Sequence, residues 1–548
     1  MCLKKTTPLA RRDLVLGAYR VVSSEQVRFL GIWLDRELRW NQQGAAALAK
    51  GRDWISRFVR LARPSFGITA KYAGQLYKSI AVPRILYGAE IYLTPPKRQA
   101  TERQKARGIR VQRTIVGRLA SAQRKAMLMV TGGMSTTATD VLEVLTGFLP
   151  FHLVVERHRF KAALRLATLP EGHPLFPHVR RAAAVDVRKF RSPVHALMND
   201  FKRDIRGVET VQTTRWDATW RSKLKIEIAG TREEAKRRES ADKTRVKIYT
   251  DGSGYKGQIG AAAVMMRDGR QVGRLKMNLG SDKECIVYNG ECAAIILAME
   301  LIRRQTGLAE ASIYVDNQAA IIAMGSRKAV PGSYLLDYAH EVYKAARRRN
   351  AGIKVTICWV PGHEDVEGNE RADTAAKEAA EGRVSAREKL PGILQGDAAI
   401  KKSKSALLQA FGGRLKNRAQ RGWRLSERYG RMAELGMKKT SKAHQNALAG
   451  MSRQHASVIT QLITGHAPLN KHLHRIGGVP SPMCSACGIY EETVAHYLAK
   501  CTAHRAARER LRARIGPAAM DANRALASTK HYPALLEYVA RTRRIAWT

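Results

Sequence analysis

Acidic and aromatic residues are both scarce in this chain of 548 residues. It has 47 Asp and Glu against 96 Lys and Arg, a formal net charge of +49, and aromatic residues make up only 6%. The shortage of acids predicts a polyanionic partner, with nucleic acid favoured over an anionic membrane. The shortage of aromatics argues against a surface that mainly stacks unpaired bases.

Long apolar runs and a disulfide framework are also missing. No apolar run reaches the length of about 18 residues that a membrane-spanning helix needs. The first residues, MCLKKTTPLARRDLVL, contain neither the apolar core nor the cleavage site of a secretory signal. The seven cysteines are an odd and sparse set, which is not typical of a secreted disulfide protein. We therefore expect an intracellular protein with no membrane partner.

Apolar residues nevertheless make up 45% of the chain, enough to form cores. The length predicts about two to four domains. Amphipathic helices are predicted between residues 66 and 170, one of them across the basic segment 104–132. A charged run at 231–245 with little apolar content predicts a linker. The basic segment 384–440 is predicted as a second linker or loose helices, and 441–548 as helices around a Cys and His cluster.

The pattern changes abruptly near residue 246. Three alternating apolar segments, VKIYTDGSG, QIGAAAVMM and GRLKMNLG, predict strands separated by turns. A helix is predicted at 288–304, followed by a strand in SIYVDN, two helices, a strand in IKVTICWVPG and a last helix in NERADTAAKEAAEG. This order predicts one α/β domain of mixed sheet and helices.

Four acidic residues occupy strand ends and helix starts in this block. Asp251 ends the first strand, Glu291 lies in the first turn of the long helix, Asp316 ends the fourth strand and Asp373 opens the last helix. Each has an ordinary alternative role, in a turn or at a helix dipole. Clustered carboxylates repel one another unless a cation neutralises them. Oxygen ligands of this kind suit Mg²⁺ and phosphoryl chemistry.

Four sequence blocks resemble the type 1 ribonuclease H domain carried by non-LTR (LINE-type) retrotransposons: KIYTDGSG, NGECAAIILAMEL, YVDNQAAI and CWVPGHEDVEGNERADTAAKEAA. The resemblance implies a ribonuclease H-like mixed five-stranded sheet, flanked by mainly α-helical N- and C-terminal regions. It implies Mg²⁺-dependent hydrolysis of the RNA strand of RNA–DNA hybrids, with two Mg²⁺ ions for which Mn²⁺ can substitute.

The same resemblance assigns roles to individual residues. The metal ligands would be Asp251, Glu291, Asp316 and Asp373, with His363 assisting product release or proton transfer. Asn289 and Gln318 would lie near the substrate backbone, although either could be an ordinary polar residue at a helix end.

A second cluster follows near the C-terminus. Cys484, Cys487, His496 and Cys501 have the spacing C-x2-C-x8-H-x4-C, which suits tetrahedral Zn²⁺. His504, three residues after Cys501, is a less favoured substitute ligand. The surrounding sequence resembles the CCHC zinc-knuckle-like tail that follows ribonuclease H in the same retroelements, which implies a structural Zn²⁺.

The segment VRFLGIWLDRELRW at 27–40 resembles the end of a retroelement reverse transcriptase. No Tyr/Phe-x-Asp-Asp motif of a polymerase palm occurs, so no polymerase active site is predicted. The expected organisation is a thumb remnant (1–60), a helical connection and linker (61–240), ribonuclease H (243–383), a basic linker (384–440) and a helical zinc-bearing tail (441–548).

The expected function is therefore that of the ribonuclease H part of a retrotransposon reverse transcriptase, acting on RNA–DNA hybrids and retroelement RNA. A complete reverse transcriptase acting in trans is a candidate partner, and the nucleus is the expected location. The alternative is a catalytically unused remnant that only binds nucleic acid.

Overall fold

A computed structural model describes residues 14–22, 24–36, 38–93, 115–185, 192–212, 214–215, 224–396 and 399–545. The chain divides into two compact units, one of residues 1–159 with 414–548 and the other of residues 160–413. Each unit is described by itself. Residues 1–13 of the predicted thumb remnant and 104–114 of the predicted basic helix lie outside the described residues.

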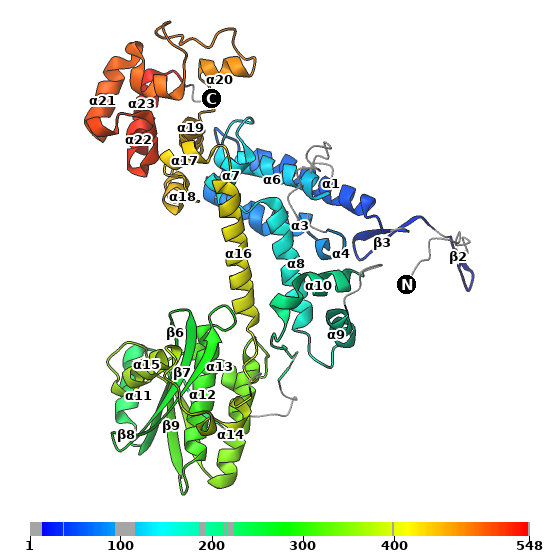
Figure 1. Cartoon of the computed structure of the whole chain (residues 1–548), viewed down its shortest axis with the longest axis vertical. Coiled ribbons are helices and arrows are strands. Elements are labelled where there is room, and N and C mark those ends of the chain that lie inside the picture. Colours follow the sequence, from blue (N-terminus) through cyan, green and yellow to red (C-terminus); the bar gives the residue numbers. More distant parts are fainter. Residues whose placement is uncertain are drawn as a thin grey trace. The chain divides into compact units, whose positions relative to one another are not determined.

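The unit of residues 160–413 contains a six-stranded mixed sheet in the order β5-β10-β9-β6-β7-β8 (Figure 1). Its strands are β5 (Lys225–Glu227), β6 (Val246–Tyr255), β7 (Gln258–Arg267), β8 (Arg270–Ser281), β9 (Glu310–Val315) and β10 (Lys354–Trp359). The five strands predicted from the sequence are present, and β5 adds a sixth by pairing parallel to β10. The predicted α/β fold class is confirmed.

Helices cover both faces of this sheet (Figure 1). On one face lie α12 (Val287–Arg303), α13 (Gln318–Gly325) and α14 (Ser333–Arg349), and their apolar side chains form the larger core with the sheet. On the other face α15 (Glu367–Ala380) packs its alanines against Tyr249, Val264 and Tyr314. The alanine face of α15 lets this helix lie close to the sheet.

Glycines bring the start of α12 against β6 and β7. A Cβ on Gly252 would lie 2.2 Å from the backbone nitrogen of Glu291, and one on Gly290 would lie 2.8 Å from the carbonyl oxygen of Gly260. A larger residue at either glycine would therefore push the helix away from the strands. These contacts place Glu291 next to the strand that carries Asp251.

The charged run predicted as a linker contains a helix, α11 (Arg232–Ala241). Thr231 caps it by accepting a hydrogen bond from the Glu234 N–H at 3.2 Å, and Arg238 pairs with Glu234 one turn away at 2.6 Å. The linker prediction was wrong for these residues because it relied on apolar content. Capping and charge pairs stabilise a helix that buries only Ala235.

The same unit contains helices at both ends of its chain segment, α9 (Phe176–Ala184) and α10 (Pro193–Ile205), and parts of α8 (Phe151–Ala167) and α16 (Lys404–Arg424). Phe160 and Phe411 stack on each other, and Phe201 meets both rings edge to face. Residues 384–440, predicted as a basic linker, thus include α16, whose buried apolar side chains include Leu407, Phe411 and Leu415.

The other unit joins segments from both ends of the chain. Its N-terminal part has strands β1 (Leu14–Leu16), β2 (Tyr19–Val21), β3 (Gln26–Phe29) and β4 (Ile32–Asp35), and helices α1 (Asn41–Leu61), α2 (Ala70–Leu76), α3 (Val82–Ile85), α4 (Ala89–Tyr92), α6 (Ile115–Thr131) and α7 (Thr139–Thr146). Its C-terminal part has α17 (Tyr429–Glu434), α18 (Lys442–Ala449), α19 (Arg453–Thr464), α20 (Asn470–Arg475), α21 (Arg505–Ile515), α22 (Ala522–Ala527) and α23 (Tyr532–Thr542).

Polar contacts from α19 join these two parts. Arg453 donates to the carbonyl oxygens of Arg63 at 3.0 Å and Val130 at 2.7 Å, and Ser457 donates to that of Pro64 at 2.7 Å. The tail therefore satisfies backbone acceptors that the N-terminal helices leave open. Within the described part of the chain, no helix is both long and apolar enough to cross a membrane.

Candidate active site and cysteine-histidine cluster

Asp251, Glu291 and Asp316 come together at one point of the sheet. Strands β6 and β9 are parallel neighbours in which Thr250 lies beside Val315, so the residue that follows each of these two carries its carboxylate to the same place. The approach of α12 at Gly252 adds Glu291. Ligand oxygens of the three side chains all lie within 4.8 Å of one another.

Burial and mutual repulsion disfavour negative charge at this point. Burial, followed by the charges of Asp316 and Asp373, raises the pKa of Asp251 to about 7. Burial and the same kind of repulsion raise the pKa of Glu291 well above its usual value. Burial also raises the pKa of Asp316, although nearby His363 acts in the opposite direction. A cation bound here would reverse these shifts.

Two carboxylate oxygens in this cluster have no hydrogen-bond partner. Oδ2 of Asp251 and Oε2 of Glu291 are both buried and unsatisfied. Buried polar atoms without partners are rare in proteins and call for an explanation. Oxygen ligands at this spacing fit a hard divalent cation such as Mg²⁺ or Mn²⁺, which would satisfy both atoms.

Asp373 lies beside this cluster, within a second group formed with His363 and Glu370. Lys377, one turn later on α15, pairs with Asp373 at 2.6 Å. Sequence reasoning missed Glu370. The available signal was its position three residues before Asp373, which puts both carboxylates on one face of a helix.

The loop between β10 and α15 carries His363 in a left-handed backbone conformation, with φ of 56°. Gly362 lies against Asp316, because a Cβ there would be 2.9 Å from Oδ2 of that residue. Nε1 of Trp359 donates to the backbone oxygen of Asp316 at 3.0 Å. Trp359 packs against the core and also holds the backbone of a candidate metal ligand.

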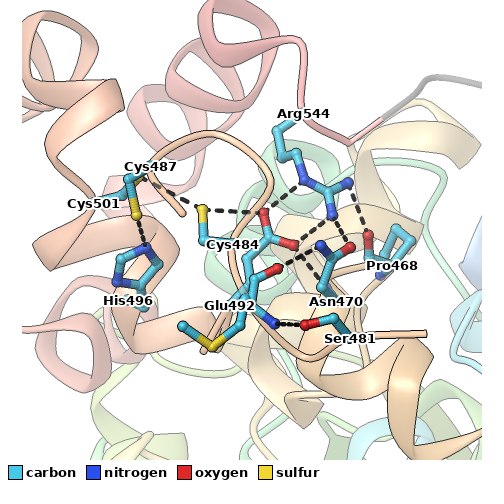
Figure 2. A network of polar contacts seen from close by, with 10 residues as sticks. Pro468, Asn470, Ser481, Cys484, Cys487, Glu492, His496, Cys501 and Arg544 are labelled. Atoms are coloured by element: carbon cyan, nitrogen blue, oxygen red, sulfur yellow. Dashed lines mark hydrogen bonds and ion pairs between the residues drawn. The ribbon is translucent and has the colours of Figure 1, made fainter. Parts of the chain in front are cut away.

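The Cys and His cluster occupies a loop and a short helix, His496–Lys500, in the other unit. Ligand atoms of Cys484, Cys487, His496 and Cys501 all lie within 4.8 Å of one another. The sulfurs of Cys484 and Cys501 are 3.8 Å apart, and Sγ of Cys487 is 3.5 Å from Nε2 of His496 (Figure 2). Three thiols and one imidazole at these separations fit tetrahedral Zn²⁺.

Backbone groups already favour a thiolate at one position of this cluster. N–H groups of Ile489 and Tyr490 lower the pKa of Cys487, whereas burial raises the pKa of Cys484 to about 11. Burial also lowers the pKa of His496, which keeps the imidazole neutral as a metal ligand requires.

The buried carboxylate of Glu492 supports the Cys and His cluster. Glu492 receives a hydrogen bond from the Asn470 N–H at 2.6 Å and pairs with Nε of Arg544 at 2.6 Å (Figure 2). Its Oε1 lies 3.7 Å from Sγ of Cys484. Arg508 donates to the backbone oxygen of Cys501 at 2.6 Å. Arg508 on α21 and Arg544, which follows the last helix, therefore hold the loop in place.

The family model described as RNase H matches residues 243–381. Residues 243–381 form a ribonuclease H domain. The predicted enzyme class, a ribonuclease H hydrolase, is thereby confirmed for this domain. No curated protein matches the chain at a significant level.

Three solved structures illustrate the similarity. RNase H1 from the halophilic archaeon Halobacterium salinarum NRC-1 is 22% identical over 25% of this chain and 98% of that chain, with a TM-score of 0.20. LC11-RNase H1 in complex with an RNA/DNA hybrid is 19% identical over 26% of this chain and 99% of that chain, with a TM-score of 0.21. LC11-RNase H1 isolated from compost by a metagenomic approach is 21% identical over the same shares, with a TM-score of 0.21.

The two residues predicted to contact substrate occupy different positions in the ribonuclease H domain. Asn289 is buried, and its Oδ1 accepts a hydrogen bond from the Ile286 N–H at 3.0 Å, which caps α12. Gln318 is exposed at the start of α13, two residues after Asp316. Asn317, between Asp316 and Gln318, caps α13 by accepting a hydrogen bond from the Ala320 N–H at 3.1 Å.

Proposed function

We propose that the ribonuclease H domain hydrolyses the RNA strand of RNA–DNA hybrids and that divalent cations support this reaction. The observation that carries the proposal is the pair of buried, unpartnered oxygens on Asp251 and Glu291, beside Asp316. A purely structural cluster of this kind would gain nothing from leaving the two oxygens unsatisfied.

The residues that would hold two Mg²⁺ ions, or Mn²⁺ in their place, are Asp251, Glu291, Asp316 and Asp373. When bound, such ions stabilise negative charge on phosphate oxygens and on the attacking and departing oxygens. Asp251 and Glu291 would release protons as the cations enter, because burial favours their neutral forms in the free domain. His363, on its exposed loop, would exchange protons with solvent or assist product release.

Charge distribution supports a nucleic-acid substrate. The chain carries a net charge of +49, whereas the candidate site is a small acidic island. Surrounding basic residues would bind phosphate backbones, and contacts to 2′-hydroxyl groups would select a hybrid over DNA. Gln318, exposed near Asp316, would contact the substrate backbone. Asn289 would act more indirectly, by fixing the helix that carries Glu291.

We further propose a biological setting from the sequence resemblance. The chain would be the ribonuclease H part of a retrotransposon reverse transcriptase, would act on retroelement RNA in the nucleus, and could work with a complete reverse transcriptase in trans. Cys484, Cys487, His496 and Cys501 would hold a structural Zn²⁺ in its tail.

The experiment is cleavage of a labelled RNA–DNA hybrid by the full chain with Mg²⁺, beside an Asp251→Asn variant. We expect cleavage of the RNA strand by the wild-type chain and a loss of about 10³-fold in the variant, as for removal of an essential charge-stabilising group. Labelled duplex DNA is the matched substrate control and should stay intact.

Absence of cleavage by the wild-type chain, or equal cleavage by both proteins, would contradict the proposal. Salt-sensitive binding of the hybrid without turnover would instead support the alternative, a catalytically unused nucleic-acid-binding remnant.

A further inference from the structure

Helix α11 lies just before the ribonuclease H match at residues 243–381, and its C-terminal end is fixed to the strands of the candidate site. Glu239 accepts a hydrogen bond from the hydroxyl of Tyr249 on β6 at 2.5 Å. Asp242, which follows the helix, accepts one from the hydroxyl of Tyr314 on β9 at 2.7 Å. These are the two strands that lead to Asp251 and Asp316.

The N-terminal end of α11 contacts the loop that carries His363. Nη1 of Arg232 is 3.0 Å from Oε1 of Glu364, and Nζ of Lys236 is 3.3 Å from Oε2 of the same carboxylate. The two cations lie one turn apart on the helix and occupy one oxygen each. Lys236 and Arg232 hold the pKa of Glu364 below its usual value.

This loop has a backbone that needs external support. Its residues His363 and Asp365 both have left-handed backbone conformations, with φ of 56° and 59°. Non-glycine residues rarely adopt such angles, and they persist where surrounding contacts hold them. Glu364 lies between the two, so its side chain is well placed to hold the loop.

We propose that α11 fixes the position of His363 through the two ion pairs that it forms with Glu364. Arg232, Lys236 and Glu364 are then positioning residues for the reaction. This inference rests on the proposed function. The helix connects rigid strands at one end with the histidine loop at the other. The loop is thereby held in register with the carboxylates, and the functional unit extends beyond residues 243–381 to the start of α11.

The decisive test is a double-mutant cycle between Glu364→Gln and His363→Ala, with hybrid cleavage as the readout. Exposed ion pairs are individually weak, so we expect Glu364→Gln to lower kcat about threefold to tenfold with little change in KM. In the His363→Ala background, the same substitution should cause no further loss, because the residue that it positions is gone. Cleavage is followed over multiple turnovers, because single turnover does not register product release, one of the two roles expected of His363.

Exchanging the charges of Glu364 with those of Arg232 and Lys236 provides a second test. Glu364→Lys should lower kcat more than Glu364→Gln, and adding Arg232→Glu and Lys236→Glu should restore much of the loss. Asp268→Asn is the matched control, because it removes an exposed ion pair with Arg245, 2.9 Å long, at the turn between β7 and β8. It should leave kcat unchanged.

Three cleavage results would each overturn the inference: an unchanged kcat in Glu364→Gln, an equal loss in both backgrounds, or no recovery on charge exchange. Amide hydrogen exchange at residues 362–366 gives a readout that does not need cleavage. Exchange there should be faster in Glu364→Gln than in the wild-type chain. If the wild-type chain cleaves nothing, the proposed function fails; unaltered exchange at the loop is the separate failure of this inference.

Discussion

The carboxylate cluster and the Cys and His cluster are two different kinds of candidate metal site in one chain. The carboxylates of Asp251, Glu291 and Asp316 come from two strands and a helix of a well-packed sheet. The ligands of the other cluster lie within residues 484–501, on a loop and around a short helix. A rigid fold holds the first set together, whereas a bound ion would itself be a main support of the second.

The two clusters also differ in how their surroundings shift the pKa values of the candidate ligands. All three carboxylates have raised pKa values, because burial and mutual repulsion oppose their charge. In the Cys and His cluster, backbone N–H groups lower the pKa of Cys487 and so favour a thiolate. The first site therefore opposes charge at all three of its carboxyl groups, whereas the second favours the thiolate at Cys487 and opposes it only at Cys484 among the groups whose pKa is shifted.

Removing zinc tests this contrast with the largest expected effect. Strong chelation should make residues 441–545 sensitive to protease while the ribonuclease H domain stays folded, since structural zinc supplies on the order of 10 kcal/mol of binding free energy. Limited proteolysis with Mg²⁺ restored measures both parts. Cys501→Ser should mimic chelation and Cys358→Ser, outside the cluster, should not. If residues 441–545 still resist protease after chelation, the assignment of a zinc site is wrong.

Glu291→Gln should separate activity from stability in the carboxylate cluster. We expect hybrid cleavage to fall about 10³-fold, equivalent to ~4 kcal/mol of transition-state stabilisation. Without metal, the variant should be as stable as the wild-type chain or more so, because the amide resembles the neutral carboxyl that burial favours. Thermal melting in chelator measures stability. The control is Glu310→Gln, an exposed position at the start of β9. A strongly destabilised, metal-free Glu291→Gln protein would contradict the repulsion argument.

Stability of the metal-free ribonuclease H domain should depend on pH. The folded pKa of Asp251 is raised from 3.8 to about 7, so the folded state binds its proton more tightly than the unfolded state. The resulting stability is fully present below pH 4 and is lost as pH rises through 7, by about 4 kcal/mol in total. Hydrogen exchange of β6 in chelator should therefore be more protected at pH 5 than at pH 8, after correction for intrinsic rates. Asp251→Asn or saturating Mg²⁺ should reduce the slope, and an unchanged slope would argue against the shift.

Trp359→Phe carries the smallest effect. It removes the hydrogen bond from Nε1 to the backbone oxygen of Asp316 and should cost ~1 kcal/mol, or about fivefold in kcat. Trp423→Phe is a matched control, because Nε1 of Trp423 donates to the backbone oxygen of Met437 at the same distance, 3.0 Å, in the other unit. Equal effects of the two substitutions on cleavage would mean that Trp359 has no special role in holding Asp316.

Local patterns were sufficient for much of the fold and for the candidate residues. Alternating apolar residues predicted the strands β6, β7 and β8, two further apolar segments predicted β9 and β10, and the order of strands and helices predicted an α/β domain. Local spacing also predicted the Cys and His cluster. The same reasoning failed at α11, because apolar content was used where the capping residue Thr231 and the charged pairs decide helix formation.

The sequence by itself determined which residue types were available for chemistry: an acidic quartet within a basic chain, and four thiol or imidazole ligands within a short segment. Only the tertiary structure decided that Asp251 and Glu291 keep unpartnered buried oxygens, that Glu370 and Trp359 join the site, and that α11 reaches Glu364. The physical reason is that spacing along the chain records local geometry, whereas burial, repulsion and contacts between distant elements exist only once strands and helices have packed.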